Sequence, residues 1–101
     1  MDVLRSVLSE SKKHYGDLEN RIEKELKSLP SVSVKKRRIA GSIYYYSQVR
    51  VGDKVVHKYL GKEKPEALLK KIERRRSLKG ELKKVREGLR LVRRTERGKR
   101  A

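Results

Sequence analysis

The chain has 101 residues, 35% of them hydrophobic and 43% charged, with a mean hydropathy of −0.91. A single domain of this length without Phe or Trp cannot enclose a large core, so we expect an elongated or self-associating fold. The absence of cysteine excludes disulfides and thiolate metal sites, and no apolar run approaches the ~18 residues of a membrane span. The expected location is the cytoplasm.

The net charge of +17 is distributed unevenly along the sequence. Residues 1–34 contain six basic and six acidic residues, whereas the rest of the chain has 24 Lys and Arg against seven acids. Such an excess is typical of polyanion binders, because neutralised phosphates release their counterions. General solubility and a thermophilic surface are the alternatives, although thermophilic surfaces mix both signs of charge. The distribution favours nucleic acid as the partner.

The first predicted element is an amphipathic helix over residues 3–28. Asp2 is suited to cap its start, and Pro30 follows its end. Apolar or small residues recur at steps of three and four along one side. This stripe contains Leu4, Leu8, Ser11, Tyr15, Leu18, Ile22, Leu26 and Leu29.

Residues 32–61 are predicted to form a two- or three-stranded antiparallel sheet. Gly52-Asp53 lies between β-branched residues and is typical of a two-residue hairpin loop, which would pair Val49 with Val56 and Tyr45 with Leu60. A third strand, from Val32 or Val34 to Ile39, would turn at Ala40-Gly41.

Alternation along these strands separates two faces. The expected core face carries Ile43, Tyr45, Val49, Val51, Val56 and Leu60. The expected exposed face carries Tyr44, Tyr46, Gln48, Arg50, Val55, His57 and Tyr59.

A second, basic helix is predicted over residues 65–96, followed by a basic tail over 97–101. Its stripe contains Leu68, Ile72, Arg75, Leu78, Leu82, Val85, Leu89 and Val92, widened by Leu69 and Leu91. The Arg75 stem is expected to lie along the interface with its head in solvent. Gly80 and Gly88 indicate either that a neighbouring helix packs closely there or that the helix simply tolerates glycine at these positions. The expected fold is α+β, with two antiparallel, coiled-coil-like helices that enclose the sheet in sequence; a homodimer would complete a four-helix bundle.

Tyrosines beside arginine and glutamine on an exposed strand face favour base stacking and hydrogen bonding to nucleic acid. Cross-strand tyrosine pairs also stabilise sheets without any ligand, so both interpretations stay open. Lys35–Arg38, next to the hairpin, are the first choice for phosphate contacts. The candidate nucleic-acid-binding residues are Lys35, Lys36, Arg37, Arg38, Tyr44, Tyr46, Gln48, Arg50, His57, Lys58, Tyr59, Arg74 and Arg76.

Catalysis has little support in the sequence. His14 and His57 are the only histidines, no metal-ligand spacing occurs, and glycine-rich phosphate loops are absent. We therefore expect no catalytic residue, cofactor, metal or small-molecule substrate. The competing function is a coiled-coil protein interaction module, adaptor or antitoxin-like, and a third is a ribosome-associated protein.

The segment GSIYYYSQVRVGDKVVHKYLGK and the helix after Pro65 resemble a short module of small uncharacterised prokaryotic and viral proteins. The module also occurs near the N-terminus of some transposases. The residues that carry the resemblance are Gly41, Tyr44, Tyr45, Tyr46, Gly52, Lys58, Tyr59, Leu60 and Gly61. The resemblance implies a hairpin leading into a helix. It implies no activity, although the association of the module with mobile elements points toward DNA rather than RNA. Taken with the charge and the tyrosines, the expected function is a nucleic-acid-binding accessory or regulatory factor of a mobile element or a small prokaryotic or viral genome.

Overall fold

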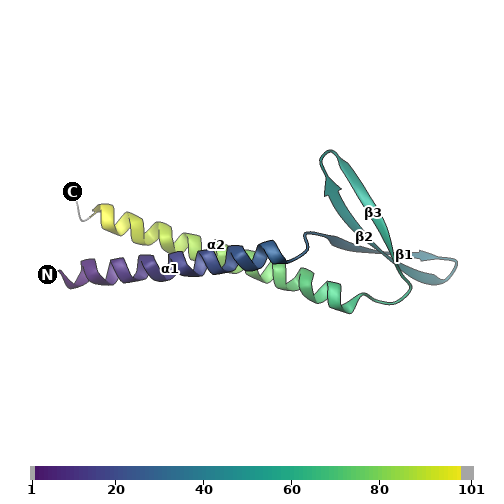
Figure 1. Ribbon diagram of the computed structural model, residues 1–101, viewed down its shortest axis with the longest axis horizontal. Helices are drawn as coiled ribbons and strands as arrows, with labels where there is room; N and C mark the ends of the chain where they lie inside the picture. The colour runs from purple at the N-terminus through teal and green to yellow at the C-terminus, as the bar shows by residue number, and fades with distance from the viewer. Residues whose placement is uncertain (1, 99–101) are drawn as a thin grey trace. The chain divides into compact units, whose positions relative to one another are not determined.

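The computed structural model describes residues 2–98 and has an α+β architecture (Figure 1). In chain order the elements are α1 (Val3–Ser28), β1 (Ser33–Ile39), β2 (Ser42–Val51), β3 (Lys54–Gly61) and α2 (Glu66–Gly98). The predicted fold class, two helices with a three-stranded antiparallel sheet between them in sequence, is confirmed. The contacts define two compact units: the helical unit, up to Ser28 and from Ser77 onward, and the sheet unit, Leu29–Arg76. Helix α2 contributes to both.

Helix α1 has the bounds that the sequence predicts, and local hydrogen bonds fix both of its ends. The N–H of Leu4 donates to Asp2 Oδ1 at 3.1 Å, so Asp2 caps the first turn as predicted. At the other end, the hydroxyl of Ser28 donates to the carbonyl of Glu25 at 2.7 Å. Pro30 then follows, where the backbone has already left the helix.

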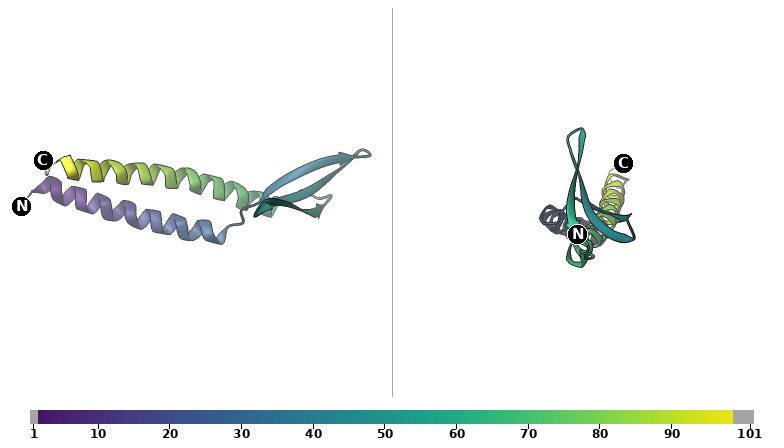
Figure 2. Two further views of the ribbon diagram at one scale, coloured as in Figure 1. Left: turned by 90° about the horizontal axis from the view of Figure 1, so that it is seen from above. Right: turned by 90° about the vertical axis from the view of Figure 1, so that its right-hand side faces the viewer.

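In the helical unit, α1 and the second part of α2 run antiparallel, side by side (Figure 2). Lys12 pairs with Glu96 at 3.5 Å, whereas Glu23, further along α1, pairs with Arg86. The buried apolar side chains all belong to the predicted stripes, and each contributes about 1.5–3 kcal/mol to the stability. They are Ile22, Leu78, Leu82, Val85 and Leu89.

The ends of the predicted stripes are less buried than expected. Leu4 is 43% exposed and Leu91 is 59% exposed, so Leu91 does not widen the apolar stripe. Arg75 also departs from the prediction, because its Nε and Nη1 are buried without a hydrogen-bond partner instead of reaching solvent. Helix α2 continues through Gly98, so the first two residues of the predicted tail are helical, while 99–101 lie outside the described residues.

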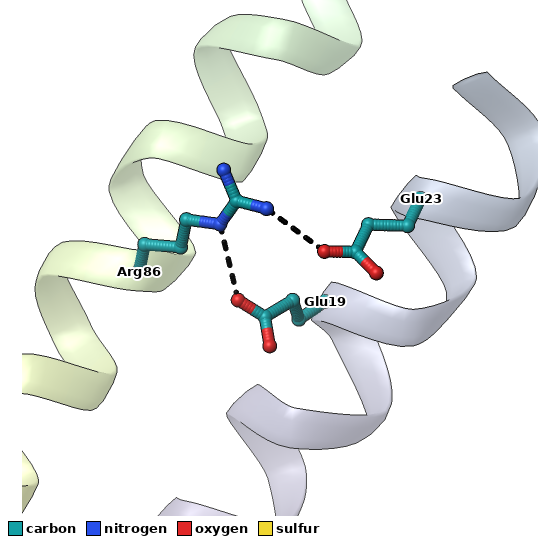
Figure 3. Close-up of polar contacts among 3 residues, drawn as sticks. All are labelled: Glu19, Glu23 and Arg86. Carbon is teal, nitrogen blue, oxygen red and sulfur yellow. Dashed lines mark hydrogen bonds and ion pairs between the residues drawn. The ribbon is translucent and has the colours of Figure 1, made fainter. Parts of the chain in front are cut away.

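One guanidinium connects the two helices of the helical unit through two carboxylates (Figure 3). Arg86 Nε donates to Glu19 Oε2 at 3.1 Å, and Nη2 donates to Glu23 Oε1 at 2.8 Å. The two acids are four residues apart on α1, which places them on the same side of the helix. These hydrogen bonds, the one to Glu19 first, raise the pKa of Arg86 above its usual value. All three side chains stay partly exposed, so these ion pairs align the helices more than they stabilise them.

The two glycines in α2 have different surroundings. A Cβ at Gly88 would lie 3.0 Å from Cζ of Tyr15, so the tyrosine ring lies directly on the helix backbone there. A Cβ at Gly80 would meet nothing within 4 Å. Close packing of the Tyr15 ring therefore explains the glycine at position 88, whereas at position 80 the helix simply tolerates a glycine.

Two short turns connect the strands of the sheet. Ala40 and Gly41 both have positive φ, 51° and 82°, which is the type I′ geometry expected of a two-residue hairpin loop. At the second turn Gly52 has φ 62°, and Val51 pairs with Lys54 as predicted. The predicted third strand and both turn positions are confirmed.

A β-bulge changes the register near the end of β3. Tyr46 lies opposite Tyr59, but Tyr45 lies opposite Gly61, so Leu60 is the extra residue. The predicted pairing of Tyr45 with Leu60 is therefore wrong. Gly61 takes a φ angle of 119°, a backbone conformation that residues other than glycine rarely adopt.

Strand β2 has a neighbour on both sides only from Tyr45 to Gln48. Ser47, in the middle of this segment, is 7% exposed and is the most buried residue of the sheet. On the same face as Ser47, the start of α2 approaches the sheet. A hollow there is lined by Val34, Lys36, Tyr45, Lys64 and Leu69.

The predicted core face is covered only in part. Tyr45 and Val49 are half-buried, as is Leu60 at the bulge. Ile43, Val51 and Val56 are 36%, 60% and 49% exposed, so for these three the prediction is wrong. The physical reason is that α2 approaches this face near Tyr45. The turn ends of both hairpins, with Ile43 near the first turn and Val51 and Val56 near the second, stay open to solvent.

We expect Ala40→Asn to raise the free energy of unfolding by about 0.5–1 kcal/mol, because Asn tolerates the left-handed conformation better than Ala. Urea unfolding followed by tyrosine fluorescence measures this, since four of the five tyrosines lie in the sheet unit. Gly41→Ala is the opposing control and should lower the same quantity. Equal stability of all three proteins would contradict the turn geometry.

Gly80→Ala should raise the free energy of unfolding by about 1 kcal/mol through helix propensity alone. Gly88→Ala should raise the free energy of unfolding by less than this or lower it, because the new Cβ meets the Tyr15 ring. In a Tyr15→Ala background the Gly88→Ala change should recover the full gain. Urea unfolding followed by far-UV circular dichroism tests all four variants, and equal effects of the two glycine changes in the wild-type background would show that Tyr15 does not pack there.

Candidate nucleic-acid interface

Three of the five tyrosines share one face of the sheet, which we call the tyrosine face. Directly opposed residues point to the same side, so the register fixes its membership. The face comprises Ser33, Lys35, Arg37, Ile39, Ser42, Tyr44, Tyr46, Gln48, Arg50, Val55, His57 and Tyr59. The side chains predicted for the exposed face of the β2–β3 hairpin therefore do lie together.

Across β2 and β3, the ring of Tyr59 contacts the rings of both Tyr44 and Tyr46. The centroid of Tyr59 lies 5.5 Å from that of Tyr46 and 6.2 Å from that of Tyr44, with tilted rings in both pairs. Tyr59 is 53% exposed, and the other two are half-buried. The result is a small aromatic surface with an open central ring.

Two cations lie over the outer rings. Arg37 Cζ is 5.5 Å from the centroid of Tyr46, and Lys62 Nζ is 5.5 Å from the centroid of Tyr44. Both distances are within the range of a cation–π interaction. The tyrosine face thus brings aromatic rings and positive charge into direct contact.

Lys62 is absent from the predicted set of binding residues. Strict alternation from the Gly52 turn would place Lys62 opposite Ile43, on the other side of the sheet, whereas the bulge at Leu60 advances it to Tyr44. The signal in the sequence is Gly61, because a glycine near the end of a strand often marks a bulge.

The basic run Lys35–Arg38 is divided between two faces. Lys35 lies opposite Tyr46 and Arg37 opposite Tyr44, on the tyrosine face. Lys36 and Arg38 lie on the other face, opposite Tyr45 and Ile43. The structure therefore does not gather these four cations into one group.

The remaining candidate residues are also distributed. Gln48 lies opposite His57 and Arg50 opposite Val55, all on the tyrosine face. Lys58, opposite Ser47, belongs to the other side of the sheet. Arg74 and Arg76 lie on α2, outside the strands.

The charge of the sheet unit is strongly one-sided. Residues 29–76 contain fourteen Lys and Arg against four acids, and Asp53 is the single acid between 33 and 61. The helical unit, residues 1–28 and 77–101, has sixteen Lys and Arg against nine acids, and Lys12 and Arg86 are engaged by Glu96, Glu19 and Glu23. The sheet unit therefore offers the stronger positive field to a polyanion.

Other kinds of site have less support in the described part of the chain. Within residues 2–98, no three His, Asp or Glu side chains come together as a set of metal ligands. Over the same residues, no helix combines the length and apolar character of a membrane span. A groove in the helical unit has Leu26 and Leu82 among its lining and is bordered by cations. The cations are Lys79, Lys83, Arg86 and Arg90, and the acid Glu87 also lines the groove.

Comparisons of the chain with protein-family models, with curated proteins and with solved structures find no match. Function is therefore inferred from the geometry and charge of the tyrosine face.

Proposed function

We propose that this protein binds nucleic acid through the tyrosine face of its sheet, with DNA favoured over RNA. The observation that supports the proposal is the contact of Arg37 and Lys62 with tyrosine rings on a face whose residues include no acid. A surface that combines positive charge with exposed aromatic rings suits the phosphates and the bases of nucleic acid at once.

The cations of this face have a spacing suited to a phosphate backbone. Lys35 and Arg37 are two residues apart on β1, about 6.6 Å along a strand, and they flank the tyrosines from one side. Lys62 flanks them from the other side. In the proposed complex these three side chains contact phosphates.

The polar residues of the tyrosine face have a different role in the proposal. Gln48 and His57 are directly opposed, one step nearer the Gly52 turn than the tyrosines, and carry amide and imidazole groups that can bond base edges or sugars. Arg50 follows next along β2 and is exposed. The proposed interface therefore extends from Lys62 along the hairpin to Arg50.

The proposed biological role is that of an accessory or regulatory factor of a mobile element or a small prokaryotic or viral genome. The resemblance of Gly41–Lys62 to a module found near the N-terminus of some transposases supports this role.

The alternation of cations along β1 provides a matched test. Lys35→Gln/Arg37→Gln removes two charges from the tyrosine face, and Lys36→Gln/Arg38→Gln removes the same two residue types from the opposite face. Binding to a short DNA is measured by fluorescence anisotropy over a series of salt concentrations. We expect the first variant to reduce the log–log salt slope by about 1.8 on duplex or about 1.4 on single-stranded DNA, with little change in the second.

Lys13→Gln/Lys24→Gln in α1 is a further control, since it changes the net charge equally at two exposed positions of the helical unit. Equal losses in all three variants would show that binding follows total charge and not this face. Wild-type protein that binds neither duplex nor single-stranded DNA nor RNA at low salt would refute the proposed function.

Self-association is a second candidate role, as a coiled-coil interaction module built on the helical unit. Val3, Leu4 and Val7 are 76%, 43% and 50% exposed within the first turns of α1. A second copy that covers them would complete a homodimer. Light scattering should then give twice the chain mass, and Val7→Glu should reduce it whereas Ser9→Glu, also exposed, should not; a monomeric wild type would exclude this role.

A further inference from the structure

We infer that the tyrosine face takes unpaired bases, so that its ligand is single-stranded nucleic acid and not a closed duplex. This inference rests on the proposed function and specifies its ligand. It depends on Tyr59, whose ring contacts both of the other rings and which remains 53% exposed.

Stacking requires a base whose face is free. In a duplex each base pair is covered above and below by its neighbours, so an aromatic ring on a protein surface reaches only base edges unless it unstacks the helix. In a single strand the base faces are accessible, and every base type can stack on a tyrosine. An open ring in the middle of a cationic face is therefore of use mainly to unpaired bases.

The packing of the sheet does not account for this open ring. On the opposite face, Tyr45 lines a hollow together with Leu69 of α2. The ring contacts of Tyr59 are to Tyr44 and Tyr46, which are themselves only half-buried. About half of the Tyr59 surface thus stays in water although the chain has few aromatic residues for its core.

The cations over the outer rings complete the site. Arg37 lies over Tyr46 and Lys62 lies over Tyr44, the two rings that contact Tyr59. A base stacked on Tyr59 would bring its flanking phosphates toward these two charges, which are held near the site before the ligand arrives. The arrangement matches the stacking and charge pattern by which proteins bind single strands.

The opposing mode is a hairpin inserted into the major groove of a duplex, as two-stranded ribbons can do. That mode would use the turn end of the hairpin, around Arg50 and Lys54, and would leave Tyr59 without a role. The two modes therefore predict different ligands and different sensitive residues.

The test compares three DNA ligands of equal length: a single strand, the same strand with abasic residues in place of its nucleotides, and the duplex. The abasic strand keeps every phosphate but has no base to stack. We expect the single strand to bind more tightly than the abasic strand by roughly 5- to 150-fold for each stacked base, and more tightly than the duplex. The salt slopes of the two single strands should agree, because their phosphates are the same.

Tyr59→Leu should remove the difference between the base-bearing and abasic strands, and Tyr59→Phe should keep it, since Phe retains the ring. Circular dichroism and urea unfolding check that both variants fold. Should Tyr59→Leu fail to fold, the comparison of the ligands on the wild-type protein decides alone.

The outcomes separate the two proposals. Absence of salt-dependent binding to all three ligands refutes the proposed function itself. Equal, salt-dependent binding of the base-bearing and abasic strands leaves nucleic-acid binding intact and overturns the stacking inference. Tighter binding of the duplex than of the single strand also overturns it and supports insertion into the groove.

Discussion

The segment Tyr45–Gln48 of β2 is the only part of the central strand that is hydrogen-bonded to neighbours on both sides. Before Tyr45, β2 is paired with β1 alone, and after Gln48 it is paired with β3 alone. A two-stranded ribbon of this kind is marginally stable in water on its own. The order of the sheet unit therefore depends on four residues, with Ser47 buried among them. The same segment places Tyr46 on one face and Tyr45 on the other, so the site and its support share one backbone.

Much of the fold follows from periodicity and turn chemistry in the sequence. The bounds of α1, the buried stripe of α2 and both hairpin turns were predictable because each depends on local spacing or on a glycine. The bulge at Leu60 was not, because regular alternation gives every residue a partner, and a single glycine at position 61 does not fix where an extra residue enters the strand. The exposure of Val51 and Val56 was not predictable either, since alternation shows which residues share a face but not whether another element covers that face.

The candidate site was predicted better in its tyrosines than in its cations. Tyr44, Tyr46 and Tyr59 lie on one side of the sheet because their relation depends on the well-marked turn at Gly52. The run Lys35–Arg38 looked like one basic patch, yet adjacent residues on a strand point to opposite sides, so it splits into two pairs. Lys62 was missed because the bulge at Leu60 decides on which face of the sheet the Lys62 side chain lies.

The part of the β2–β3 hairpin between Val49 and Val56 has no third strand beside it. Its valines at 51, 55 and 56 are 60%, 48% and 49% exposed, so bending this ribbon would break few buried contacts. Its cross-strand hydrogen bonds would persist through such a motion, because both strands move together. The tip can therefore follow the contour of whatever lies on the sheet, while the rings at its base keep their places.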